Sequence, residues 1–80
     1  MPHVKVYITL KPTLLDAQGR VVEHALGTLG YSRVHDVRIG KYLSMTVEGD
    51  RGAVERDVKE MCERLLANPT IEDYRFEVDE

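Results

Sequence analysis

Residues 34–48 have the sequence VHDVRIGKYLSMTVE, in which apolar and polar residues alternate along most of the stretch. The apolar side chains fall on odd positions, namely Val37, Ile39, Leu43, Met45 and Val47. The polar ones fall on even positions, namely Asp36, Arg38, Ser44, Thr46 and Glu48. A period of two residues is typical of a strand that buries one face. The alternation is interrupted at the centre, where Gly40 and Lys41 stand.

Three backbone paths are open at this glycine. A two-residue hairpin turn at Gly40-Lys41 would pair Ile39 with Tyr42 and put Tyr42 on the apolar face. A three-residue loop pairing Ile39 with Leu43 keeps the apolar row intact, and so does one long strand bent at Gly40. The alternation therefore disfavours the tight hairpin, and we favour the long strand. This strand would be much longer than the usual five or six residues. It would therefore extend beyond the other strands of its sheet and need a strand from a second chain to pair with.

The same alternation predicts the first and last strands of the fold. The first runs from His3 to Lys11 and ends at Pro12, because proline has no amide hydrogen to donate to a sheet. The last runs from Ile71 to Val78.

Apolar residues at helical spacing predict two helices between these strands. The first runs from its N-cap Asp16 to about Leu29, and the second follows its N-cap Asp50 and runs from Arg51 to about Ala67. The apolar stripe of the first consists of Ala17, Val21, Val22, Ala25, Leu26 and Leu29. The residues that we expect the second to bury are Val54, Val58, Met61, Cys62, Leu65 and Leu66.

The two halves of the chain repeat at an offset of 37 residues, which aligns Asp36 with Asp73 and Leu29 with Leu66. The core positions expected in one half fall on apolar residues in the other. We therefore expect two strand–helix–strand units, in the order β-α-β-β-α-β, joined through residues 34–48. The expected fold class is α+β, with two helices on one face of an antiparallel sheet.

The 80 residues are expected to form a single domain over 1–80, with a thin core that favours oligomerisation. The net charge of −3, with acidic and basic residues mixed along the chain, disfavours a nucleic-acid partner. No apolar run is long enough to span a bilayer, and no leader precedes the first strand, so we expect no membrane association. The single cysteine fits the reducing cytoplasm.

No pattern of catalytic, cofactor-binding or metal-ligating residues stands out. The three histidines, His3, His24 and His35, have no ligand-like spacing with one another or with Cys62. Cys62 belongs to the apolar stripe of the second helix and is interpreted as a small buried hydrophobe.

Residues 36–42 instead suggest a surface for protein contact. They combine charged and aromatic side chains beside an expected strand edge, and arginine and tyrosine are enriched at interfaces. The plainer interpretation is a solvated sheet face with cross-strand ion pairs. The candidate contact residues are Asp36, Arg38, Gly40, Lys41 and Tyr42.

Three segments carry a more specific signal: VYITLKPTLLDAQGRVVEHALGTLGY, DVRIGKY and EMCERLLANPTIEDYRFEV. Together they resemble the PurS family, the small subunit of phosphoribosylformylglycinamidine synthase. The similarity runs from Val4 to about Val78, and DVRIGKY and the ending LLANP-x-IEDY are its most specific parts. The family more often has glycine in place of Thr13 and proline in place of Ala17, which are adjustments of a turn.

The resemblance implies a part in de novo purine biosynthesis, within an ATP-dependent, glutamine-using ligase complex. In such a complex a glutaminase subunit releases ammonia, and a large synthetase subunit uses ATP and magnesium to install it on formylglycinamide ribonucleotide. The small subunit binds both and assists ammonia transfer. It is implied to be cytoplasmic, to form a dimer or tetramer, and to have no catalytic residue or bound cofactor of its own.

A different class of function also remains open. Many small α+β dimers bind a metabolite at a subunit interface and regulate other proteins. A clear, saturable thermal stabilisation by a nucleotide or an amino acid would favour this alternative.

Overall fold

The computed structural model describes residues 1–79, and it consists of three strands and two helices. Each helix follows a strand along the chain, and α2 ends in a short π-helical turn, η1. The elements are β1 (His3–Leu10), α1 (Ala17–Thr28), β2 (Gly40–Thr46), α2 (Arg51–Met61), η1 (Cys62–Leu66) and β3 (Glu72–Asp79). The α+β class expected from the sequence is confirmed.

The three strands form one antiparallel sheet in the order β2-β1-β3. In the central strand, Val6 lies between Leu43 of β2 and Phe76 of β3. The neighbouring residue Tyr7 lies between Tyr42 and Arg75. The alternation in the sequence therefore separates an apolar face of the sheet from a polar one, as it predicts.

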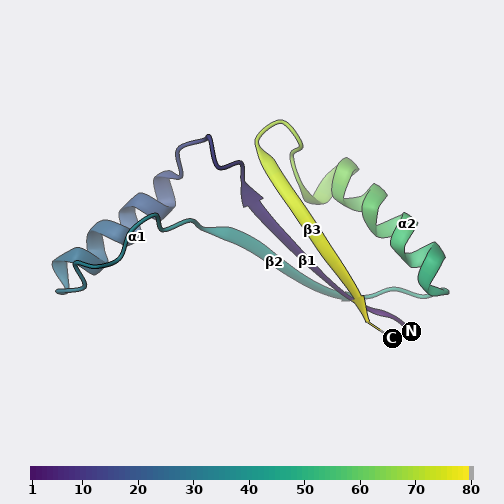
Figure 1. The fold of residues 1–80 in the computed structure, drawn as a ribbon. Helices are drawn as coiled ribbons and strands as arrows, with labels where there is room; N and C mark the ends of the chain where they lie inside the picture. The colour runs from purple at the N-terminus through teal and green to yellow at the C-terminus, as the bar shows by residue number, and fades with distance from the viewer. Residues whose placement is uncertain (80) are drawn as a thin grey trace.

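Only α2 covers the apolar face (Figure 1). Its turns bury Val54 and Val58 against the centre of β1, and Asp50 caps its first turn by accepting a hydrogen bond from the Ala53 amide. The buried core consists of Val4, Val6, Ile8, Val54, Val58, Cys62, Ala67 and Val78. The core thus lies at one end of the chain's fold, between α2 and the sheet.

The first helix does not join α2 on that face, which corrects the expectation of two helices on one face of the sheet. Pairing between β1 and β2 ends at Thr9 and Gly40, so residues 34–39 continue past the end of β1 and α1 lies beyond the sheet with them (Figure 1). The molecule measures 48 × 26 × 14 Å, with a radius of gyration of 16.0 Å. A compact chain of this length would have a radius of about 12 Å.

The centre of residues 34–48 is not a hairpin. Gly40 is the first residue of β2 and pairs with Thr9, so the tight turn disfavoured by the alternation is absent from this position. The long strand that we favoured is only partly formed. β2 spans Gly40–Thr46, and residues 34–39, which precede it, do not pair with another strand. Asp36 has a positive φ of 57°, which interrupts the extended path. Gly40 permits close packing, since a Cβ there would lie 2.4 Å from the carbonyl oxygen of Ile8.

The second helix is also shorter than expected. Its α-helical part ends at Met61, and the π-helical turn continues to Leu66. A π turn holds more residues than an α turn, so it rotates the side chains that follow. Leu65, expected in the core, is 82% exposed, while Leu66 packs against the core. Neither helix within residues 1–79 is long and apolar enough to cross a bilayer.

Candidate interaction surfaces

The structure divides the five candidate contact residues between different surfaces. Tyr42 lies on the open face of the sheet, whereas Lys41 lies on the opposite face and forms an ion pair with Glu72 at 3.7 Å. Arg38 donates a hydrogen bond from Nη2 to the carbonyl oxygen of Lys11, 3.0 Å away, and Asp36 is exposed on the segment that connects α1 to β2. They do not form one patch.

The open face of the sheet carries an aromatic and cationic row that crosses all three strands. Tyr42 and Tyr7 have ring centroids 5.3 Å apart, and the Arg75 guanidinium lies 3.9 Å from the centre of the Tyr7 ring. Such a cation–π contact stabilises an exposed arrangement by about 0.5–1 kcal/mol. The contact between Tyr7 and Arg75 depends on the register between β1 and β3, which the alternation in the sequence does not determine.

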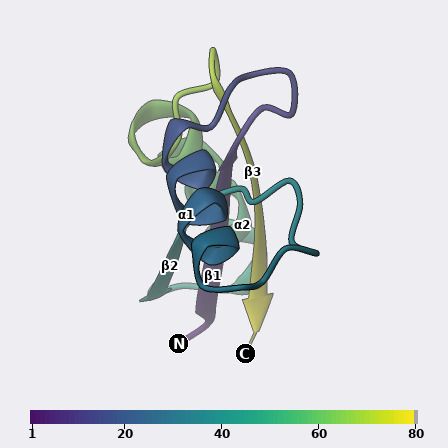
Figure 2. The same cartoon turned by 90° about the vertical axis from the view of Figure 1, so that its left-hand side faces the viewer.

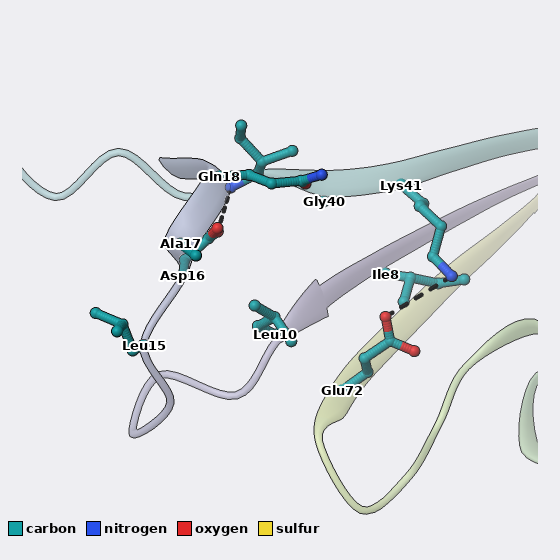
Figure 3. A pocket seen from close by; sticks show the side chains of 10 residues that line it. Ile8, Leu10, Leu15, Asp16, Ala17, Gln18, Gly40, Lys41 and Glu72 are labelled. Atoms are coloured by element: carbon teal, nitrogen blue, oxygen red, sulfur yellow. Dashed lines mark hydrogen bonds and ion pairs between the residues drawn. The ribbon is translucent and has the colours of Figure 1, made fainter. Parts of the chain in front are cut away.

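A pocket of about 380 Å³ lies between the end of β1, the start of α1 and the start of β2 (Figure 3). Apolar side chains form one part of its lining, and the ion pair between Lys41 and Glu72 lies at its other side. The apolar side chains that line it are Ile8, Leu10, Leu15, Ala17 and Ile39. The pocket therefore joins an apolar surface to a pair of opposite charges.

Asp16 fastens α1 to the segment that precedes β2. Its Oδ1 accepts the Gly19 amide at 2.8 Å, which caps the helix as expected, and its Oδ2 accepts the Ile39 amide at 2.7 Å. The side chain is only 3% exposed. The hydrogen bond from Ile39, and after it the one from Gly19, lowers the pKa of this carboxyl group below its ordinary value of 3.8.

Replacing Asp16 with Asn is expected to make folding less sensitive to acid. Because the folded-state pKa is lower than the unfolded one, the carboxylate stabilises the fold fully above pH 3.8, and this stabilisation is lost as pH falls through the folded-state pKa. Thermal unfolding measured from about pH 6 to about pH 2 should show a smaller decrease in Tm for Asp16→Asn than for the original chain. Equal decreases in the two proteins would contradict this role for Asp16.

The apolar face of α1 is largely uncovered. Val21 and Leu29 are 70% and 73% exposed, whereas their counterparts at the offset of 37 residues, Val58 and Leu66, contact the core. The outer edge of β2 is also free of any strand neighbour within residues 1–79. An unpaired strand edge and an exposed apolar helix face both favour contact with another chain.

Of the groups considered for chemistry, Cys62 lies in the core and His3 lies on the open face of the sheet. Cys62 is buried, and burial raises the pKa of its thiol, which disfavours the reactive thiolate. The His3 ring lies 3.2 Å from the hydroxyl of Ser44 on the neighbouring strand. Within the part of the chain that the structure describes, no three histidine, cysteine or acidic side chains are grouped as metal ligands.

Comparison with known proteins identifies relatives along the whole chain. A family model described as PurS, phosphoribosylformylglycinamidine (FGAM) synthase, matches residues 3–80. The PurS subunit of phosphoribosylformylglycinamidine synthase from Bacillus subtilis is 55% identical over 80 residues, which cover 100% of this chain and 95% of that protein. A crystal form of B. subtilis PurS superposes with a TM-score of 0.92 at 55% identity and covers 100% of both chains.

Two further solved structures have the same fold. Methanocaldococcus jannaschii PurS is 38% identical with a TM-score of 0.91, over 100% of this chain and 98% of that one. It is described as one of the subunits of formylglycinamide ribonucleotide amidotransferase in the purine biosynthetic pathway. A chain in the structure of PurLQS from Thermotoga maritima is 27% identical with a TM-score of 0.81, over 98% of this chain and 99% of that one.

Proposed function

The chain belongs to the PurS family of phosphoribosylformylglycinamidine synthase, and we propose that it is the small adaptor subunit of that synthase in de novo purine biosynthesis. The observation that carries this proposal is its full-length similarity to a chain of the T. maritima PurLQS structure. Its partners would be a glutaminase subunit and a large synthetase subunit. These would use glutamine, ATP and magnesium in the cytoplasm to convert formylglycinamide ribonucleotide to the amidine.

In this role the chain contributes contacts and leaves the reaction to its partners. Ammonia that escapes into bulk water is diluted and protonated, so the glutaminase and synthetase sites must be held close together. An adaptor that binds both subunits raises the effective concentration of ammonia at the second site without forming a bond to it. The elongated shape of the chain and its two separate exposed surfaces, the open sheet face and the uncovered face of α1, suit this function.

We also propose that two copies of the chain associate through α1 and the free edge of β2. Val21 and Leu29 are exposed in the single chain, although their counterparts in the second half pack against a sheet. A second copy would supply the missing sheet surface for α1 and a strand neighbour for residues 34–46. Removing this apolar surface from water stabilises association by about 25 cal/mol per Å² before the cost of association is subtracted.

Omitting the chain from a mixture of its two partner subunits is expected to lower glutamine-dependent amidine formation by about tenfold or more, because the ammonia is no longer transferred at high effective concentration. The same mixture supplied with an ammonium salt should keep most of its activity, since the synthetase then needs no transfer. Both rates are measured as amidine formed per synthetase subunit. Full glutamine-dependent activity without this chain would overturn the adaptor function.

A further inference from the structure

The segment after α1 runs back beside the helix (Figure 2). A pocket of about 430 Å³ is lined by residues of α1 and of this segment. Val34 is the only aliphatic side chain among its lining residues. The polar side chains that line it are Arg20, Glu23, His24, Tyr31, Ser32 and His35. The pocket is therefore built almost entirely from groups that form hydrogen bonds.

Most of these groups have no partner within the described part of the chain. Among residues 1–79, the side chains of Arg20, Tyr31 and Ser32 form no hydrogen bond or ion pair. Glu23 is the exception, because its Oε1 accepts the Val37 amide at 3.0 Å and thereby holds the wall of the pocket against α1. The side chains of Arg20, Tyr31 and Ser32 are exposed to solvent, so a guanidinium and two hydroxyl groups can exchange water for a ligand.

Gly27 is a second observation that favours a ligand. It is the last residue but one of α1, where alanine is still a better helix former than glycine. No packing requires it, since a Cβ at this position would meet nothing within 4 Å. Because Gly27 also lines the pocket, its missing side chain leaves this space open. Departures from local sequence preference without a packing reason are expected at functional positions.

We propose that this pocket binds the phosphate group of a small phosphate monoester. Arg20 supplies the planar, permanently charged fork that matches phosphate oxygens. The Tyr31 and Ser32 hydroxyls and the imidazoles of His24 and His35 supply further donors. Glu23 is the one group that opposes an anion, and one of its carboxylate oxygens is already occupied by the hydrogen bond that it accepts from the Val37 amide. The volume leaves room for a sugar beside the phosphate.

The test is an NMR titration of the isotope-labelled full chain, in which the chemical shifts of the backbone amides are measured. Four compounds are added in separate experiments at constant ionic strength: ribose 5-phosphate, inorganic phosphate, ribose and sodium acetate. Ribose 5-phosphate should cause saturable shifts confined to residues 20–35, and inorganic phosphate weaker ones at the same amides. Ribose and acetate should cause none. This pattern separates a phosphate ester from free phosphate and from a general anion effect.

Three variants decide whether the pocket is the site. Arg20→Gln should weaken binding by about tenfold or more, because a charge-assisted hydrogen bond is lost. Its matched control, Arg56→Gln on the exposed side of α2, should leave the affinity unchanged. Gly27→Leu should fill the pocket and abolish the shifts while the chain stays folded. The proposal would be overturned if neither phosphate compound caused saturable shifts, or if Arg20→Gln and Gly27→Leu bound ribose 5-phosphate as tightly as the original chain.

Discussion

Gly19→Ala is expected to separate α1 from the segment before β2. A Cβ at this position would lie 2.0 Å from the carbonyl oxygen of Val37, and neither backbone can yield without breaking the hydrogen bonds that join them. Overpacking of this kind costs about 1–3 kcal/mol, and it exceeds the gain of about 1 kcal/mol that alanine brings to a helix. We expect a lower free energy of unfolding and faster hydrogen exchange at the amides of Val37 and Ile39.

Gly27→Ala is the matched control, because it makes the same chemical change in the same helix. A Cβ at Gly27 meets nothing within 4 Å, so the substitution should stabilise the chain by up to about 1 kcal/mol. Denaturant unfolding and amide exchange of the two variants give the comparison. If both variants became more stable to the same degree, the close approach between Gly19 and Val37 would be wrong.

Patterns that depend on neighbouring residues predicted most of the secondary structure. Alternation placed β1 and β3 to within a residue or two, and short polar side chains before the apolar stripes identified both N-caps, Asp16 and Asp50. These features follow from local geometry, so the sequence contains them directly. Alternation also disfavoured a tight hairpin at Gly40, which pairs with β1 instead.

Features that depend on the whole fold were not predictable in the same way. The spacing of apolar residues around Leu65 fits a regular α-helix and gives no sign of the π turn. The pattern therefore placed Leu65 in the core, although the residue is exposed. The second hydrogen bond of Asp16, to the Ile39 amide, joins residues that are distant in sequence. The internal repeat predicted that both helices cover one sheet, but one chain provides a sheet surface for α2 alone.

The apolar face of α1 is exposed, whereas the equivalent face of α2 is buried. A substitution on the exposed face is therefore expected to have the largest effect on self-association. Val21→Glu should convert the proposed dimer to single chains, because it places a charge in the apolar face of α1 that a second copy would cover. Burying a carboxylate without a partner would cost several kcal/mol, so the dissociation constant should rise by about a hundredfold or more. Analytical ultracentrifugation over a range of concentrations measures this constant.

Leu65→Glu provides the control on the other helix. Leu65 is also a highly exposed aliphatic residue, at 82% against 70% for Val21. It lies in η1, which continues α2, and α2 and α1 lie on opposite sides of the molecule (Figure 1). The same change of charge there should leave self-association unchanged. Because both variants replace an exposed aliphatic side chain with glutamate, they determine which helix carries the contact. Loss of self-association in Leu65→Glu and not in Val21→Glu would assign the interface to α2, and the uncovered face of α1 would then be available to the synthetase or glutaminase subunit.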